Sequence, residues 1–336
     1  MEDHPLLRLP SMPGELARVE EELTAAVESA HPQLTTMAGH LAGAGGKRIR
    51  PLFAVAAARC GDDLGTGQVP VEVIRGGVSV ELVHLGSLHH DDVIDEALTR
   101  RTVESVNARW GNLRAILSGD FLLARASELA TAIRPAEVGN EVAGLLAATI
   151  GQLCAGEVAE LQSAYQLDRS EEDYYSSIDG KTASLFATAA RIGAIVGGLP
   201  REHIDRLTAF GTAYGMAFQI VDDVLDLVAT DAQLGKPAGH DLVEGVYTLP
   251  VLRAFETGEG TELRALLGRP VHGTEWERAR ALVRQSGGVE SAIAEARAFA
   301  ARAAEELQPV GHHAAGEALA AAASHLLSSI EAVRAA

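Results

Sequence analysis

The chain has 336 residues, of which 47% are hydrophobic and only 4% aromatic, so it is long enough to bury one large core or two ordinary ones. Its formal net charge is -18, from 46 acidic against 28 basic residues, and this argues against the basic surface of a nucleic-acid-binding protein. Abundant alanine and leucine with few aromatic rings favour closely packed helices.

Helical periodicity dominates the chain after residues 1–14, a segment with three prolines that we expect to form a flexible tail. Residues 15–30 have the spacing of an amphipathic helix, and 71–88 is apolar on nearly every face, which is typical of a helix buried inside a bundle. No strand is indicated, so residues 15–336 are predicted to form a single all-α domain. Further helices are predicted near 113–133, 137–164, 171–198, 202–228, 247–256, 275–286, 289–306 and 312–335.

The cellular location is indicated by what the sequence lacks. The start of the chain, MEDHPLLRLP, is acidic and proline-rich, unlike a signal peptide. Apolar runs such as 183–199 are interrupted by Arg191 or by glycines, and fall short of the ~18 apolar residues of a membrane span. Cys60 and Cys154 have no metal-ligand spacing and are interpreted as two buried thiols in a reducing compartment. We therefore expect a cytoplasmic protein without a transmembrane segment.

Two acidic motifs of the form DDxxD contain six of the 16 aspartates. Each motif follows an apolar run, and without a ligand like charges one helical turn apart repel by a few tenths of a kcal/mol. A solvated acidic helix face would account for one such motif but not for two. Hard carboxylate oxygens suit Mg²⁺, which prefers a few carboxylates together with waters and substrate phosphates. The predicted Mg²⁺ ligands are Asp91, Asp92, Asp95, Asp222, Asp223 and Asp226.

The few basic residues are placed where they could bind phosphate. All three lysines, Lys47, Lys181 and Lys236, lie directly after a glycine, and Arg100 and Arg101 follow the first acidic motif. Backbone amides and bases at such turns bind phosphate oxygens. Each feature alone is usually a surface feature, but an acidic protein with anionic substrates has to concentrate its bases in this way.

Taken together and in order, five segments resemble the trans-isoprenyl diphosphate synthase family, over residues 45 to about 250: GGKRIRP, ELVHLGSLHHDDVIDEALTRR, GKTASLF, FQIVDDVLDL and GKPAGHDL. The resemblance implies an all-α bundle around a deep central cavity, usually homodimeric, with the two acidic motifs facing each other across its mouth. It implies Mg²⁺ as cofactor, and isopentenyl diphosphate and an allylic diphosphate as substrates. The similarity to bacterial long-chain polyprenyl diphosphate synthases also implies a product that can pass to a membrane enzyme.

The resemblance assigns a role to individual residues. The six aspartates hold Mg²⁺ and act in catalysis together with Lys181. Asp241 contacts the metal indirectly, from outside the ring of direct ligands. The isopentenyl diphosphate site is formed by Lys47, Arg50, His84 and Arg101. The allylic diphosphate site is formed by Arg100, Lys181, Thr182, Gln219 and Lys236. The chain departs from many relatives at 102–105 and at Val246, where it lacks a base, so less positive charge is expected there.

Product length is predicted from the helix that precedes Asp91. Gly86 and Ser87 lie one turn before Asp91 on the same face, and Val83 lies about one further turn of ~5.4 Å along the helix. Short-chain enzymes of the family often carry an aromatic ring there, so small residues predict an open path and a product longer than C20, which is about four isoprene units. In the alternative, Gly86 is small so that another helix can approach, and the floor comes from 142–150.

Three other functions are compatible with parts of this pattern. A short-chain farnesyl or geranylgeranyl diphosphate synthase would share the chemistry and differ only in product length. A class I terpene cyclase usually carries a second metal motif with Asn, Ser and Glu, and would leave GGKRIRP without a role. A non-catalytic subunit of a heteromeric synthase typically loses aspartates, whereas this chain keeps all six.

Overall fold

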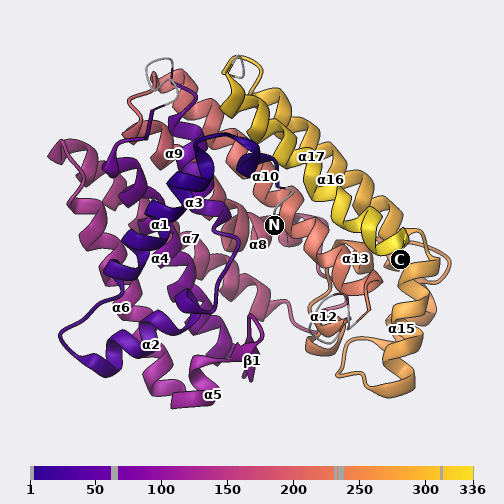
Figure 1. Ribbon diagram of the computed structural model, residues 1–336. Helices are drawn as coiled ribbons and strands as arrows, with labels where there is room; N and C mark the ends of the chain where they lie inside the picture. Colours follow the sequence, from indigo (N-terminus) through magenta and orange to yellow (C-terminus); the bar gives the residue numbers. More distant parts are fainter. Residues whose placement is uncertain (1–3, 62–66, 231–232, 234–237, 311–312, 336) are drawn as a thin grey trace. The chain divides into compact units, whose positions relative to one another are not determined.

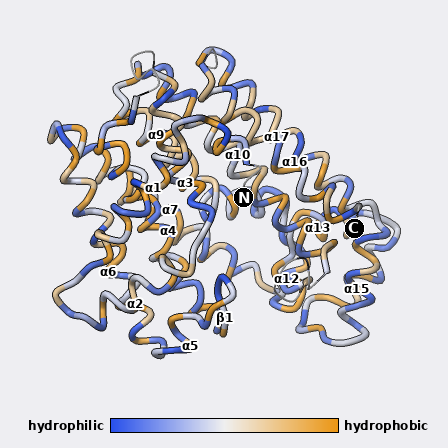
Figure 2. Tube along the Cα trace, in the orientation of Figure 1, coloured by the Kyte–Doolittle hydropathy of each residue, from blue (hydrophilic) through white to orange (hydrophobic). Residues whose placement is uncertain are grey.

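The computed structural model describes residues 4–61, 67–230, 233, 238–310 and 313–335, and these are almost wholly helical (Figure 1). Along most helices hydrophobic and hydrophilic stretches alternate, as expected for helices with one buried face (Figure 2). The all-α class is thereby confirmed. The helices are η1 (Pro5–Arg8), α1 (Met12–Ala26), α2 (Pro32–Gly43), α3 (Ile49–Ala58), α4 (Val71–Ile94), α5 (Val106–Trp110), α6 (Asn112–Thr131), α7 (Ala136–Gln162), α8 (Glu171–Ile178), η2 (Asp179–Ala183), α9 (Ser184–Val196), α10 (Arg201–Val228), α12 (His240–Glu244), α13 (Leu249–Phe255), α14 (Gly260–Leu266), α15 (Gly273–Gln285), α16 (Gly288–Glu306) and α17 (Ala314–Ala335).

The chain divides into two compact units. The first acidic motif belongs to unit 1 and the second to unit 2, and whether the units act as the predicted single domain around a central cavity stays a prediction. Unit 1 comprises Met1–Ile150, Leu185–Ala209 and Leu307–Leu319. Unit 2 comprises Gly151–Ser184, Phe210–Glu306 and Ala320–Ala336.

Unit 1 is built around α4, which is buried on nearly every face, as predicted. The backbone of α3 approaches α4 so closely that a Cβ at Gly77 would lie 3.1 Å from the Cα of Pro51. On α9, a Cβ at Gly193 would lie 2.0 Å from the carbonyl oxygen of Ala54. Small residues therefore let the helix backbones pack closely, in keeping with the low aromatic content of the chain.

The N-terminal segment departs from the flexible tail predicted for residues 1–14. Residues 5–8 form η1, and α1 begins at Met12. Leu6 and Met12 are fully buried in unit 1. The prediction is wrong for the described part of this segment, because apolar side chains between the prolines contribute to the core.

Other departures occur where the local sequence signal is weak. α2, α3 and α14 were not predicted, and such short helices depend on tertiary packing for their stability. The predicted helix over 171–198 is interrupted by the π-helical turn η2. An antiparallel hairpin joins α4 to α5 where no strand was expected. Its strands, β1 (Thr99–Arg100) and β2 (Val103–Glu104), have two residues each.

Unit 2 has its own hydrophobic core. Its side chains come mainly from α8, α10, α13, α15 and α16, and include Tyr174, Ile220, Leu252, Leu282 and Ile293. The helix α10, which carries the second acidic motif, contributes Ile220, Val221 and Val224 to this core. The motif is therefore held on a packed helix.

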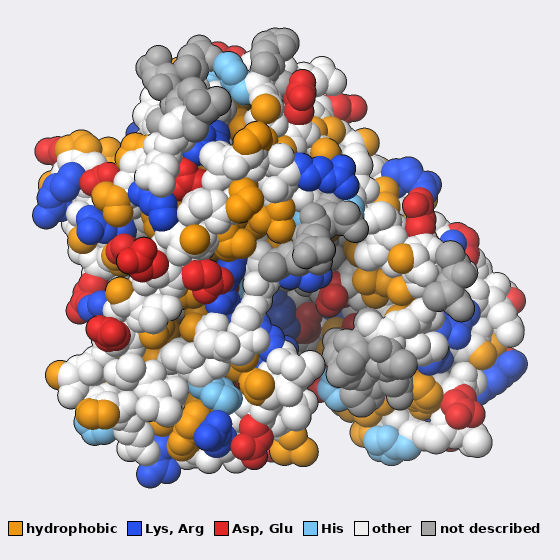
Figure 3. All heavy atoms as spheres, in the orientation of Figure 1, with side chains coloured by type: hydrophobic (Ala, Val, Ile, Leu, Met, Phe, Trp, Pro, Cys, Tyr) orange, Lys and Arg blue, Asp and Glu red, His pale blue; other side chains and the backbone are white. Residues whose placement is uncertain are grey.

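The surface has two properties that bear on partners. On the face in Figure 3, acidic and basic side chains are interspersed and form no continuous basic patch. Among the described helices, α7 alone is long and apolar enough to cross a membrane by length and composition, with a mean hydropathy of 1.5 over its most apolar window. Only 22% of that window is buried.

Candidate functional site

The first acidic motif ends α4, and its three aspartates differ in exposure. Asp91 is half-buried and Asp95 is exposed, whereas Asp92 is fully buried. Both Nε and a terminal nitrogen of Arg100, on the hairpin, lie 2.7 Å from Asp92 Oδ1. The Asn107 side chain donates to the backbone carbonyl of Asp92 at 2.8 Å. Burial raises the pKa of Asp92, and the Arg100 guanidinium offsets part of that rise.

Three of the predicted isopentenyl diphosphate residues, Arg50, His84 and Arg101, interact electrostatically in unit 1. The Arg50 guanidinium lies 4.4 Å from the ring centroid of Phe186. His84 is half-buried on α4, and burial together with the positive charges of Arg50, Arg101 and Arg100 holds its pKa well below the usual range. These bases are thus near one neutral imidazole. Lys47 is exposed on the loop before α3.

The second acidic motif lies near the end of α10. As in the first motif, its first aspartate is more exposed than its second. Asp222 is exposed and Asp223 is buried. The Tyr174 hydroxyl donates to Asp223 Oδ2 at 2.6 Å, and the Gln219 amide donates to Oδ1 at 2.8 Å. Burial raises the pKa of Asp223 to about 7, although both hydrogen bonds act to lower it.

Asp226, the last aspartate of the second motif, contacts the segment that contains Asp241, the residue predicted to support the metal site from outside the motif. Asp226 is buried, and its backbone carbonyl accepts a hydrogen bond from the Gly239 amide at 2.7 Å. The Asp241 amide approaches Asp226 Oδ2 at 3.4 Å. Asp241 is therefore next to the motif through its backbone. Lys236, the remaining predicted phosphate ligand, lies outside the described residues.

Lys181 and Thr182 lie in η2, a kind of turn that is frequent at functional sites. Lys181 Nζ forms ion pairs with Glu157, at 2.8 Å, and with Glu160, both on α7. The Thr182 hydroxyl donates to the side-chain oxygen of Gln219 at 2.7 Å. Neither glutamate was predicted from the sequence. The only signal was their i, i+3 spacing on a helix, which is common.

Close backbone packing positions this turn. A Cβ at Gly156 of α7 would lie 2.4 Å from the backbone nitrogen of Lys181. A Cβ at Gly180 would lie 2.9 Å from the carbonyl oxygen of Gln152. The two glycines therefore allow α7 and η2 to touch, and place Lys181 within reach of the α7 glutamates.

The predicted chain-length residues Gly86, Ser87 and Val83 differ in what surrounds them. A Cβ at Gly86 would lie 3.1 Å from both the Gly119 carbonyl oxygen and Cδ2 of Leu123 on α6. Gly86 thus lies against α6, which supports the alternative that it is small to let another helix approach, and a path for the product past Gly86 stays a prediction. Ser87 is half-buried, with its hydroxyl bonded to the His84 carbonyl, and Val83 is fully buried.

The donor set fits Mg²⁺ that arrives with a phosphate ligand. Among the described residues, no group of three or more His, Cys, Asp or Glu side chains forms a ready-made metal cage. Instead, the acidic motifs present carboxylates with some exposure at helix ends, namely Asp91, Asp95 and Asp222. This matches a cation that uses few protein carboxylates and completes its shell with water and phosphate.

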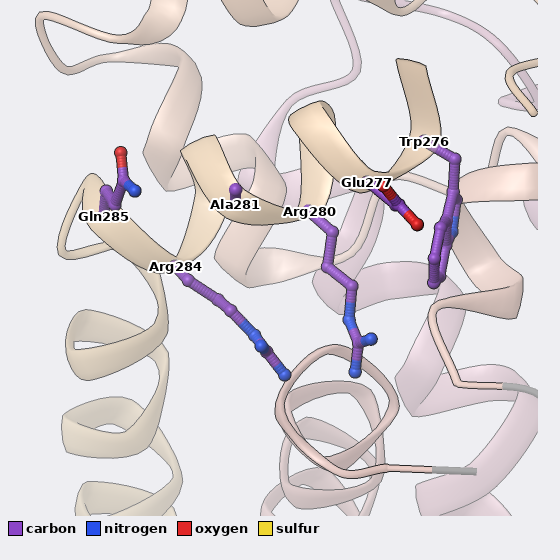
Figure 4. A pocket seen from close by; sticks show the side chains of 6 residues that line it. All are labelled: Trp276, Glu277, Arg280, Ala281, Arg284 and Gln285. Atoms are coloured by element: carbon purple, nitrogen blue, oxygen red, sulfur yellow. The ribbon is translucent and has the colours of Figure 1, made fainter. Parts of the chain in front are cut away.

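A hollow of 440 Å³ lies beside α15, and three of the residues that line it bond to the backbone after the second motif (Figure 4). Trp276 of this hollow donates through Nε1 to the Gly239 carbonyl at 3.0 Å. Arg280 and Arg284 each donate to the Leu227 carbonyl, at 2.7 and 3.0 Å. These arginines satisfy carbonyls at the C-terminal end of α10, where cations are favourable.

Three comparisons relate the chain to known proteins. A sequence model of the family described as polyprenyl synthetase matches residues 31–285. The chain is 40% identical over 295 residues to nonaprenyl diphosphate synthase of Mycobacterium tuberculosis, covering 87% of this chain and 85% of that one. It is 45% identical over 243 residues to heptaprenyl diphosphate synthase component 2 of Geobacillus stearothermophilus, covering 72% of each. A solved polyprenyl synthase of Caulobacter crescentus, complexed with calcium and isoprenyl diphosphate, has a TM-score of 0.87 at 33% identity, covering 96% of this chain and 97% of that one.

Proposed function

This chain belongs to the polyprenyl synthetase family, and on that premise we propose that it condenses isopentenyl diphosphate with an allylic diphosphate, releasing diphosphate. The product is an all-trans polyprenyl diphosphate longer than four isoprene units. The observation that carries the proposal is that both acidic motifs and the bases of GGKRIRP, TRR and GKT occur in one chain, with the described bases near carboxylates or near one another.

In the proposed reaction the protein binds and orients two diphosphates. Lys47, Arg50 and Arg101, with the neutral His84, bind isopentenyl diphosphate. The allylic diphosphate is bound by Arg100, Lys181, Thr182, Gln219 and Lys236. These preorganised cations and donors stabilise the charge that develops on the leaving diphosphate as the allylic C–O bond breaks. The isopentenyl double bond then attacks the allylic carbon, and a proton is lost to the departing diphosphate.

Mg²⁺ is the proposed cofactor. When bound, it would neutralise charge on the leaving diphosphate. Asp91, Asp95 and Asp222 are the proposed direct ligands, because their carboxylates are the more accessible ones. Asp92 and Asp223 act through Arg100 and Gln219, with which they form hydrogen bonds. Asp226 and Asp241 complete the metal site from the segment after α10.

A long-chain product is proposed from the relatives named above, which are nonaprenyl and heptaprenyl synthases. The half-buried Ser87, one turn before Asp91, keeps the small side chain expected along the path of a long product. We expect this reaction in the cytoplasm, with the product passing to a membrane enzyme.

Chromatography of the products tests this function. The purified chain is incubated with Mg²⁺, labelled isopentenyl diphosphate and, in separate reactions, primers of two to four isoprene units. We expect labelled products longer than C20. Products of four units or fewer would leave the reaction class standing but contradict the length, and cyclic hydrocarbons would indicate a terpene cyclase.

A second copy of the chain is the proposed partner, and α6 is the proposed contact surface. Leu113, Ile116 and Leu117 are 80%, 40% and 63% exposed, and their i, i+3, i+4 spacing places them on one face. Light scattering should report a homodimer, and Leu113→Glu with Leu117→Glu should give a monomer. Leu98→Glu, at a residue 73% exposed outside α6, is the control. A wild-type monomer that gains activity only with another chain would indicate a heteromeric enzyme.

A further inference from the structure

The loop that begins the family resemblance contains a third base, Arg48, to which the proposed function gives no role. Its neighbour Lys47 is exposed, but Arg48 itself is only 3% exposed. Arg48 is the residue before α3, and its backbone has φ 47° and ψ 33°, in the left-handed region. A residue with a Cβ pays roughly 1–2 kcal/mol for this conformation, so other contacts have to stabilise it.

The contacts of the Arg48 guanidinium supply that stabilisation. Nε and a terminal nitrogen donate to the two carboxylate oxygens of Glu20 on α1, at 2.7 and 3.2 Å. The other terminal nitrogen lies 3.2 Å from Glu81 Oε1 on α4, and the Ala42 carbonyl accepts a further bond at 2.6 Å. Arg48 thus joins the loop to α1, α2 and α4.

Glu81 is the partner that makes this arrangement specific. It is only 2% exposed, and a buried carboxylate is costly unless a cation balances its charge. It lies three residues before His84 on α4, so the two side chains lie on neighbouring parts of one helix face. The Arg48–Glu81 pair therefore ties the loop to the helix that carries a predicted isopentenyl diphosphate ligand.

A second arginine, Arg101, also contacts the loop backbone. Arg101 donates to the Leu41 carbonyl at 3.1 Å and to the Gly45 carbonyl. A Cβ at Gly46 would lie 2.8 Å from terminal nitrogens of both Arg48 and Arg101. Two guanidinium groups thus approach the loop backbone at Gly46 where a Cβ would otherwise lie.

We propose that Arg48 and Glu81 form a positioning pair that fixes the loop before α3, and thereby orients Lys47 and Arg50 toward isopentenyl diphosphate. The pair does not itself touch the substrate, since the Arg48 guanidinium is used by Glu20, Glu81 and Ala42. The inference rests on the proposed function for the identity of the ligand. Its physical basis is that a small misplacement of a binding group can cost a large factor in rate or affinity.

The pair also has an electrostatic consequence. Lys47, Arg48 and Arg50 are three bases within four residues. The buried Glu81 compensates the charge of Arg48, so the remaining two bases can meet an anion without a third, buried cation repelling them. Removal of Glu81 should therefore disturb the loop even though Glu81 is not in the loop.

The test measures KM for each substrate in Arg48→Met and Glu81→Leu. Both variants should raise KM for isopentenyl diphosphate by about tenfold, with KM for the allylic primer and kcat changed less than about threefold. The double variant should be no worse than the more affected single variant, because both changes break one pair. In EDTA, the Kd for inorganic diphosphate should also rise by about tenfold, and this readout does not require turnover.

Arg59→Met is the matched control. Arg59 also pairs with a buried carboxylate in unit 1, Glu15, at 2.8 Å, but not in the loop before α3. This variant should lower thermal stability to a similar extent and leave both KM values and the diphosphate Kd unchanged. If Arg48→Met does not fold, Arg48→Lys and Glu81→Gln should still raise KM for isopentenyl diphosphate several-fold.

Three results would overturn the positioning role: equal rises in both KM values, an unchanged diphosphate Kd in folded variants, or the same effects in Arg59→Met. Failure of the proposed function is distinct, since it would appear as a wild-type enzyme that makes no prenyl product. In that case the diphosphate Kd still decides whether Arg48 and Glu81 position the loop.

Discussion

The two acidic motifs have the same sequence pattern, but the buried second aspartate has different partners in each. In unit 1, Asp92 is paired with the cationic Arg100 at 2.7 Å. In unit 2, Asp223 accepts hydrogen bonds from the neutral side chains of Tyr174 and Gln219. An identical motif therefore does not imply an identical electrostatic environment, because partners from elsewhere in the chain set it.

The difference appears in the pKa values. Burial raises the pKa of both carboxyl groups, but for Asp92 the positive charge of Arg100 opposes the rise. Neutral donors oppose it less, and the pKa of Asp223 reaches about 7. The first motif thus holds a charged pair, whereas the second holds a carboxyl group that titrates near neutral pH.

The first prediction concerns what the motifs share. Asp91→Ala and Asp222→Ala should each lower kcat by at least about a hundredfold while the fold remains intact, because both remove an accessible proposed metal ligand. EDTA should abolish activity and added Mg²⁺ should restore it. Asp168→Ala, at an exposed aspartate of unit 2 outside the motifs, is the control. Full activity in EDTA would contradict the metal mechanism in both units.

The second prediction separates the two substrates. Lys47→Ala should raise KM for isopentenyl diphosphate by about tenfold, and Lys181→Ala should do so for the allylic primer, since each removes a ground-state contact. Lys181→Ala also leaves Glu157 and Glu160 without their shared cation. Steady-state kinetics with each substrate varied in turn measures both values. Equal effects of one variant on both substrates would remove the assignment.

The third prediction concerns product length. Ser87→Phe should shift the products several-fold toward shorter chains, because its ring would enter the proposed path one turn before Asp91. Gly86→Ala should keep the wild-type product pattern and lower the melting temperature, because its Cβ meets α6. Chromatography of the products measures the first effect. An unchanged distribution in Ser87→Phe would place the path elsewhere.

The fourth prediction is the smallest and addresses the contrast between Asp92 and Asp223. Asp92→Asn should destabilise the protein by about 1–2 kcal/mol, because it leaves the partly buried Arg100 without its counter-charge. Asp223→Asn should cost less near neutral pH, because its carboxyl group is then partly protonated. Thermal melts in EDTA compare the two variants.

The pH dependence of these melts sharpens the contrast. The pKa of Asp223 is higher in the folded than in the unfolded protein, so its stabilising contribution is full at low pH and is lost as the pH rises through about 7. Relative to wild type, Asp223→Asn should therefore become more stable as the pH rises from about 4 to about 7, between the unfolded and the folded pKa of the carboxyl group, and should change little above that. If the difference in melting temperature between Asp223→Asn and wild type did not change with pH, the raised pKa would be contradicted.

Much of the fold followed from periodicity alone. Periodicity predicted the long helices α4, α7, α10, α16 and α17, because apolar residues recur along them at helical spacing. Most of the ends of these helices lie within a few residues of the predicted ones. The short helices α2, α3 and α14 were missed, since their stability depends on packing. The prolines of residues 1–14 predict a flexible tail, but Leu6 and Met12 between them are buried, and such burial depends on tertiary contacts that the local sequence does not show.

The candidate site residues could be proposed from the sequence, but the partners that the fold gives them could not. The motifs identified the aspartates, lysines and arginines by type and spacing. The roles of Glu157 and Glu160 as partners of Lys181, and of Glu81 as partner of Arg48, carried no such signal. Gly86 shows the same limit, because a glycine next to a motif looks alike whether it faces a product or another helix.

The sequence by itself determined the all-α class and the family, and it predicted a role for the two acidic motifs and their bases, because helical periodicity and motif spacing are local properties of the chain. Only the tertiary structure decided which charges are buried and what compensates them. Arg48 meets Glu81 across 33 residues, and Tyr174 meets Asp223 across 49. Burial removes water from these groups, so the contacts made by the folded chain set their charge and position.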